Sequence, residues 1–184
     1  QYVCNRLTKT LDFPTYFVII VLLLQKVKNM QVHIKGGSKR QKQLVRSMVN
    51  FCQKKLMPKM YNIEVNINLR NFGKDDSLGY AIPSDYADLH RPREFDVDIN
   101  KQQKLRRLLE TVAHEMVHVK QFARGELYES VRRNKHRWQG KWLNTDPKYW
   151  DQPWEIEAHG REVGLFVQWA EANKLGDKRW THDG

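Results

Sequence analysis

The chain has 184 residues, a formal net charge of +11, and 40% hydrophobic and 11% aromatic residues. This length is suited to one domain with a proper core, and the composition excludes a disordered chain. The two cysteines, Cys4 and Cys52, exclude a disulfide framework and a thiolate metal site.

The cysteine content and the charge also bear on compartment and partners. With so few cysteines a reducing compartment is the default, so we expect a cytoplasmic protein. The basic balance is compatible with contact to nucleic acid or to a DNA-bound protein. A solvated positive surface is the commoner explanation, and both interpretations stay open at this point.

Residues 1–29 differ from the rest of the chain. An apolar run, Tyr16 to Leu24, follows Arg6 and Lys9. It is shorter than the roughly 20 residues that a membrane-spanning helix needs, so we expect no stable membrane span. No small-residue cleavage site follows it. We therefore expect residues 1–29 to be an extension outside the domain, either a translated upstream stretch or a targeting segment for secretion, and residues 30–184 to be one domain.

The first half of this domain predicts one helix and then strands. Ser38 is a good N-cap, and apolar residues recur behind it at helical spacing until Pro58. Residues 63–69 alternate strictly between apolar and polar, which is typical of a half-buried strand. Shorter strands are expected at residues 79–82 and 95–99, with a turn-rich loop at 71–77.

The second half predicts two helices. Asn100 is placed to cap a long helix that closes near Gly125. A Trp-rich segment that we expect to be irregular comes next. Pro153 then opens a last helix that runs to about Asn173. The order of elements predicts a compact α+β domain with an N-terminal helix, a small and mostly antiparallel sheet, and two further helices.

The long helix contains the sequence His114-Glu115-Met116-Val117-His118. Histidines at positions i and i+4 lie one above the other on a helix, so both imidazoles can reach one tetrahedral ion. Glu115 projects beside them, where it can take a proton from an activated water. The pattern predicts a zinc site with one Zn²⁺ per chain and Glu115 as general base.

A catalytic zinc needs a third protein ligand. On the last helix Glu155 shares a face with Ala158 and Phe166, the side expected to be buried, whereas Glu157 shares a polar stripe with Arg161. A buried carboxylate needs a partner, and a metal ion would supply it. We therefore predict Glu155 as the third ligand, with Glu157 as the second choice and His136 as the third.

Two further side chains of the last helix are candidates for a supporting role. His159 and Glu162 lie one to two turns from Glu155 and could hydrogen-bond a ligand imidazole. For Glu162 a plain pair with a nearby Lys or Arg is the commoner alternative. For His159 the alternative is a histidine whose ring is satisfied within the helix.

The motif on a helix after a strand, followed by Glu155-Ile156-Glu157-Ala158, resembles the gluzincin metallopeptidases. Residues 30–175 are similar to the small SprT-like metallopeptidases of bacteriophages. SprT-type proteins usually use a third histidine after the metal helix, and here only His136 could fill that role.

This resemblance implies a zincin-like fold and a hydrolase that cleaves peptide bonds of a protein or peptide substrate, in the host cytoplasm if the protein is a phage product. It implies that zinc polarises the scissile carbonyl while Glu115 carries the proton to the leaving amine. It also implies that the strand at residues 95–99 lies at the cleft edge and pairs with an extended substrate. Tyr149, His159 and His136 are the candidates to stabilise the oxyanion.

A second hypothesis is a basic nucleic-acid-binding module whose metal is structural or absent. Trp138, Trp142, Trp150 and Trp154 lie near Lys and Arg residues, and aromatic rings can stack on bases. Packing of these rings against the last helix is the commoner explanation.

Overall fold

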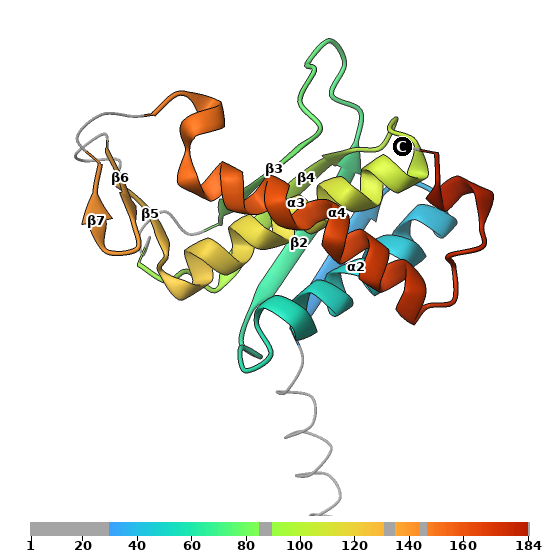
Figure 1. Ribbon diagram of the computed structural model, residues 1–184, viewed down its shortest axis with the longest axis horizontal. Coiled ribbons are helices and arrows are strands. Elements are labelled where there is room, and N and C mark those ends of the chain that lie inside the picture. Colours follow the sequence, from blue (N-terminus) through green and yellow to red (C-terminus); the bar gives the residue numbers. More distant parts are fainter. Residues whose placement is uncertain (1–29, 85–89, 131–134, 144–146, 184) are drawn as a thin grey trace, which may run out of the picture.

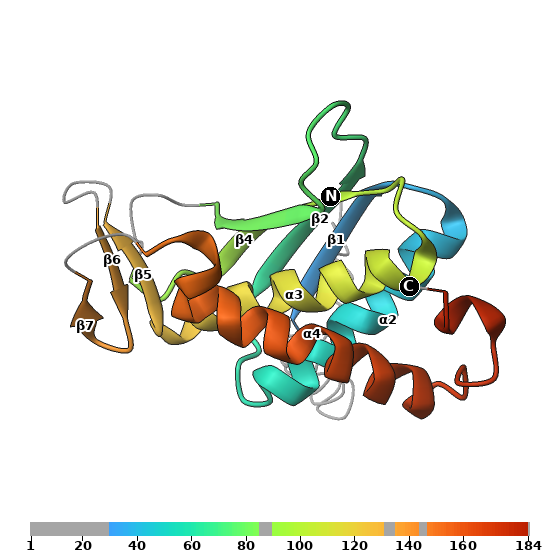
Figure 2. The ribbon, with the colours of Figure 1, turned by 45° about the horizontal axis from the view of Figure 1, so that its top comes forward.

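A computed structural model describes residues 30–84, 90–130, 135–143 and 147–183. Helices α2 and α3 lie on one face of a four-stranded sheet, α4 packs on these two helices, and a separate small sheet lies beside them (Figures 1 and 2). The α+β class predicted from the sequence is confirmed. In chain order the elements are β1 Gln31–Gly36, α2 Lys39–Leu56, β2 Glu64–Arg70, β3 Gly79–Pro83, β4 Glu94–Asn100, α3 Leu105–Arg124, β5 Leu127–Ser130, β6 Lys135–Trp138, β7 Lys141–Trp142 and α4 Pro153–Ala172, with short 3-10 turns η2 Tyr149–Asp151 and η3 Arg179–Thr181.

The main sheet has the strand order β1-β2-β4-β3. The pairs β1–β2 and β2–β4 are parallel, and only β3–β4 is antiparallel. The expectation of a mostly antiparallel sheet is therefore wrong for this sheet. Two connections produce the parallel pairs. Helix α2 carries the chain from β1, a strand that the sequence did not predict, back to β2. After β2 the chain returns along β3, so that β4, inserted between β2 and β3, runs parallel to β2.

Strand β4 lies inside the sheet, between β2 and β3. Its backbone groups bond to both neighbours, so it cannot receive an extended substrate, and the expectation that residues 95–99 form the cleft edge is wrong. Strand β3 is the edge strand on that side. At Gly79 a Cβ atom would lie 2.9 Å from Thr111 Cγ2 of α3, so the missing side chain lets β3 approach this helix closely.

The Trp-rich segment is more ordered than expected. Strands β5, β6 and β7 form an antiparallel sheet, in which Leu127 of β5 pairs with Trp138 of β6. The ring of Trp138 lies 6.3 Å from that of the buried Trp154 at the start of α4. This small sheet therefore packs onto the beginning of the last helix.

The helix boundaries follow local chemistry. Ser38 caps α2 in a capping box with Gln41, as its residue type predicts. Helix α3 begins later than expected because the Asn100 side chain accepts a hydrogen bond from the Gln102 amide in a turn, which leaves Lys104 at the N-cap. Gly125 ends α3 in the left-handed conformation that favours glycine, as predicted.

The core lies between the sheet and the helices. It contains the inward residues of β2 and β4 and one face each of α2, α3 and α4. Trp169 of α4 is fully buried, and its indole Nε1 donates to Ser47 Oγ of α2. Within the described residues no helix is long and apolar enough to cross a membrane.

Candidate metal centre

Helices α3 and α4 lie side by side and bring the predicted ligand residues together (Figure 2). His114 and His118 lie on α3, and Glu155 lies in the first turn of α4. All three residues are buried, with relative exposures of 8%, 7% and 9%. Glu155 shares its buried helix face with Ala158 and Phe166, as its phase along α4 predicted.

The ligand atoms of these three residues converge on one point. His114 Nε2 lies 3.1 Å from His118 Nε2, and the Glu155 carboxylate oxygens lie 3.3 Å from each of these nitrogens. In a tetrahedral site with bonds of about 2.0–2.1 Å, neighbouring ligand atoms are separated by about 3.3 Å. Glu155 Oε2 is also buried without a hydrogen-bond partner. This buried His/Glu group could hold a metal ion.

Each ligand histidine is oriented by an oxygen atom on the other side of its ring. His114 Nδ1 lies 2.8 Å from Glu162 Oε2, and His118 Nδ1 lies 2.8 Å from Gln121 Oε1. A carboxylate or amide oxygen accepts a hydrogen bond from Nδ1–H, so the proton stays on Nδ1 and Nε2 keeps its lone pair for a cation. The glutamine cannot be reversed, because its Nε2 donates to the Trp154 carbonyl oxygen at 2.9 Å.

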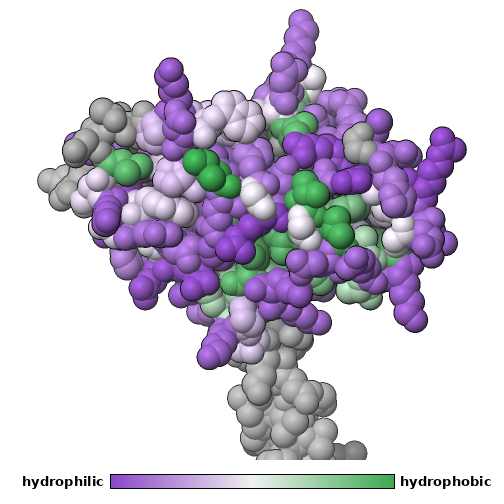
Figure 3. Space-filling model, viewed as in Figure 1, coloured by the Kyte–Doolittle hydropathy of each residue, from purple (hydrophilic) through white to green (hydrophobic). Residues whose placement is uncertain are grey.

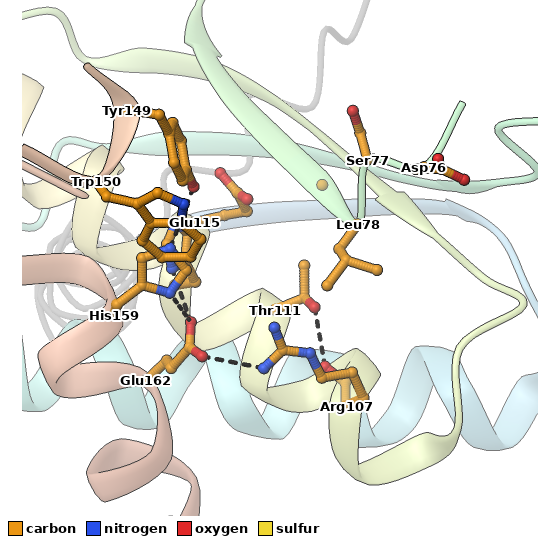
Figure 4. Close-up of a pocket in the computed structure, with 12 residues that line it drawn as sticks. Asp76, Ser77, Leu78, Arg107, Thr111, Glu115, Tyr149, Trp150, His159 and Glu162 are labelled. Carbon is orange, nitrogen blue, oxygen red and sulfur yellow. Dashed lines mark hydrogen bonds and ion pairs between the residues drawn. The ribbon is translucent and has the colours of Figure 1, made fainter. Parts of the chain in front are cut away.

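Glu162 lies at the centre of a second set of contacts. Arg107 Nη1 donates to it at 3.0 Å, and His159 Nδ1 lies 3.3 Å from it (Figure 4). His114, His159 and Glu162 also have ligand atoms close enough to one another to share a cation. The Arg107 guanidinium already neutralises this carboxylate, so the geometry favours the supporting role for Glu162. Both sequence alternatives for Glu162, the ligand-orienting contact and the ion pair, are present together.

Glu157 points to a different set of partners. Lys120 Nζ lies 2.7 Å away and Arg161 Nε 2.9 Å away, and Gln121 Nε2 donates to it at 3.1 Å. Burial opposes ionisation, but the contacts with Lys120 and Gln121 hold the pKa of this carboxyl below its usual range. The converging ligand atoms therefore include Glu155 and not Glu157.

His136 lies apart from the converging ligand atoms. It belongs to β6, its ring stacks on Trp154 at 4.8 Å, and its Nε2 lies 3.9 Å from Glu129. These neighbours hold His136 on the small sheet, where it lines the same hollow as Glu155.

The charges of the histidines and carboxylates in this centre depend on one another. Burial opposes the charged form of His114, but its contacts with the Glu155 and Glu162 carboxylates raise its pKa to about 9. For Glu155 burial also opposes ionisation, and the contacts with His114 and His118 hold the pKa of its carboxyl far below its usual range. A cation that enters this site must displace a proton, so its affinity falls as the pH falls.

Glu115 is the remaining acid beside the ligands, and it is only 3% exposed. Burial raises the pKa of its carboxyl to about 7, although the positive charges of His118 and His114 oppose this rise. A carboxyl with this pKa exchanges protons near neutral pH, as a general base must.

Two hollows of about 390 and 300 Å³ open beside the candidate ligands: His114 lines both, and His118 and Glu155 line the smaller one. Both are lined by Gly79, His114, Glu115 and Tyr149, so together they form one cleft along the edge strand β3. In the larger hollow Tyr149 and Trp150 lie on one side and Ser77 on the other (Figure 4).

Tyr149 lies where the two hollows meet and is 47% exposed. Its hydroxyl lies 3.2 Å from His159 Nε2. Burial and the neighbouring Glu155 carboxylate raise the pKa of the phenol, so it stays protonated and can donate a hydrogen bond. Of the three oxyanion candidates, Tyr149 and His159 are therefore adjacent to each other, whereas His136 is not part of this pair.

Gln121 and Arg107 are functional candidates that the sequence analysis did not identify in these roles. A signal existed for Gln121, because it lies three residues after His118 on the same helix face. No comparable signal existed for Arg107, since its partner Glu162 lies on another helix.

Comparison of the chain with protein-family models, curated proteins and solved structures finds no match.

Proposed function

We propose that the protein is a zinc-dependent metallopeptidase, in which His114, His118 and Glu155 hold the metal and Glu115 is the general base. The observation that carries the proposal is the convergence of the three ligand atoms at 3.1–3.3 Å beside the buried Glu115. Two imidazoles and one carboxylate form a donor set suited to catalytic zinc. The cleft that reaches them would give substrate access to the metal.

The residues of the chain divide the work of hydrolysis. Bound zinc would supply Lewis acidity, which polarises a carbonyl and acidifies water. Glu115 takes the proton of the attacking water and delivers it to the leaving amine. Tyr149 lines both hollows and His159 lines the larger one, where a phenol O–H or an imidazole N–H can donate to the developing oxyanion.

The edge strand β3 supports a polypeptide as substrate. Its backbone has β4 as partner on one side only, and Gly79 to Ala81 line the cleft beside His114 and Glu115. An extended peptide can add to such an edge through main-chain hydrogen bonds. The sequence predicted that residues 95–99 would pair with the substrate. These residues form the internal strand β4, so we assign this role to its neighbour β3.

The deciding experiment compares Glu115→Gln with the control Glu171→Gln, an exposed residue near the end of α4. Zinc content and cleavage of unfolded casein would be measured for both variants and the parent protein. We expect all three to bind one zinc per chain and Glu115→Gln alone to lose hydrolysis by at least about 1,000-fold. Zinc-loaded Glu115→Gln that cleaves as fast as the parent would contradict the proposal. It would favour the basic nucleic-acid-binding module, in which Glu115 has no catalytic task.

A further inference from the structure

The outer face of α2 carries an unusual set of charges. The helix has six basic residues and no acidic one: Lys39, Arg40, Lys42, Arg46, Lys54 and Lys55. All six are exposed. In the part of the chain that the structure describes, none of the six forms an ion pair with a carboxylate.

The first turn of α2 works against the helix macrodipole. Lys39, Arg40 and Lys42 lie at the positive end of the helix, where acidic residues are favoured. Neighbouring like charges on one helix also repel each other. A local arrangement that lowers stability in this way indicates a role outside the fold, because nothing within the described fold compensates these charges.

Five of the exposed residues of α2 form one row along the helix. Lys39, Gln43, Arg46, Asn50 and Lys54 recur at spacings of three or four residues, so they lie on one face. With a rise of 1.5 Å per residue this row is about 22 Å long. Cations interleaved with amide side chains are typical of surfaces that contact a phosphodiester backbone.

Two of the α2 cations, Arg46 in the row and Arg40 beside it, are held in place by contacts with other parts of the fold. Arg46 Nη1 donates to the Val32 carbonyl oxygen of β1 at 2.9 Å, beside a hollow of about 310 Å³ lined also by Asn50 and Lys54. At the other end the Arg40 guanidinium lies 5.7 Å from the ring of Trp180. Ordered cations lose less conformational entropy when they bind an anion.

We propose that this outer face of α2 is a docking surface for the phosphodiester backbone of a nucleic acid. A negatively charged membrane is the other polyanion to consider. The large hydrophobic residues exposed on the described part of the protein do not lie on α2, and three of them, Ile156, Val163 and Val167, belong to α4. Figure 3 shows hydrophobic atoms across the middle of the view, where α4 crosses the molecule in Figure 1. An interfacial membrane helix needs such residues beside its cations, so the charge pattern of α2 fits nucleic acid.

The surface is separate from the candidate metal centre. No residue of α2 lines either hollow that opens on the metal ligands. The proposal therefore does not depend on the peptidase function, and substitutions on α2 can be tested without altering the ligand residues.

The test measures binding of the full chain to a fluorescein-labelled DNA duplex and to a single strand of the same length, by fluorescence anisotropy at several salt concentrations. The variant Lys39→Gln/Lys42→Gln/Lys54→Gln removes three charges from α2, and the control Lys74→Gln/Lys141→Gln/Lys148→Gln removes three exposed charges elsewhere. Glutamine keeps helix propensity close to that of lysine, so both variants should fold.

We expect the α2 variant to bind at least 10-fold more weakly to one or both nucleic acids, and the slope of log K against log salt to become shallower by about 2–3 units. The control should change affinity by less than about 3-fold. Equal losses in the two variants would overturn the proposal, because net charge alone would then explain binding. Absence of binding at low salt would also overturn it, as would binding only to phosphatidylserine vesicles.

Discussion

The pair α3–α4, which carries the candidate metal ligands, and the outer face of α2 differ in how their charges are paired. Near the candidate ligands, cationic side chains form ion pairs with carboxylates: Arg107 pairs with Glu162, and Lys120 pairs with Glu126 and Glu157. On α2 six cations have no such partner among the described residues. The difference shows that the charge of this protein is segregated. Near the candidate ligands the positive and negative side chains are paired. The unpaired positive charges lie on the outer face of α2.

The largest effect should come from removing the carboxylate that faces both imidazoles. We expect Glu155→Ala to weaken zinc binding by more than about 1,000-fold, because one of three ligands is lost. Glu157→Ala is the matched control on the same helix turn, and it should weaken binding by less than about 10-fold, since Glu157 contacts Lys120 and not the ligands. Competition with a chromophoric chelator measures both affinities. The reverse order would show that Glu157 is the ligand.

A smaller loss is expected from the residue that orients His118. Gln121→Ala removes the oxygen at His118 Nδ1 and the bond to the Trp154 carbonyl, so zinc affinity should fall by about 10–100-fold. Gln168→Ala, on the exposed side of α4, is the control and should leave the affinity unchanged. The same chelator competition applies. Unchanged affinity in Gln121→Ala would mean that this hydrogen bond does not position the ligand.

The pH dependence of stability offers a third test, made on the metal-free protein. Because burial raises the pKa of Glu115 from 4.5 to about 7, the folded state holds a proton that the unfolded chain releases between these values. Stability is therefore lost as the pH rises from about 4.5 to 7. Glu115→Gln removes this loss, so it should stabilise the protein on the order of 2 kcal/mol at pH 8 and hardly at all at pH 4.5. Urea unfolding at both pH values measures this, and equal effects at the two would contradict it.

The smallest effect concerns the unpaired cations of α2. Salt screens their mutual repulsion, so raising the salt from about 0.05 to 0.5 M should stabilise the parent protein by roughly 0.5 kcal/mol. The variant Lys39→Gln/Lys42→Gln/Lys54→Gln should gain less from salt and be slightly more stable than the parent at low salt. Urea unfolding measures the differences. A variant that is less stable at low salt would show that these lysines support the fold.

Sequence patterns predicted the elements whose chemistry is local. The phase of α4 placed Glu155 on the buried side and Glu157 on the polar side, because helix geometry fixes faces from spacing alone. Ser38 and Gly125 likewise marked helix ends through their own side chain or lack of one. For the site, the sequence nominated the ligands, Glu115 and the neighbours His159, Glu162 and Tyr149, which the structure brings to one cleft.

The features that the sequence did not predict depend on contacts between distant residues. Strand β1 has only Val32 and Ile34 as its inward apolar pair, and its parallel pairing follows from the path of α2 rather than from its own residues. Strands β5 and β6 are rich in charged and aromatic residues and show no alternation, so their pairing could not be recognised. The expectation for residues 1–29 lies outside the described residues.

The candidate ligands lie on two different helices, so a metal ion bound there would also affect stability. An ion held by His118 and Glu155 would close a loop that contains β5, β6, β7 and η2. In the chain-entropy view such a cross-link restricts the unfolded chain as a disulfide would, by about 4 kcal/mol for a loop of this length. Removing the ion with a chelator should therefore expose the segment between the two helices to proteolysis well before the sheet unfolds. The metal would then act as a reversible cross-link between α3 and α4 in a chain that has no disulfide among its described residues.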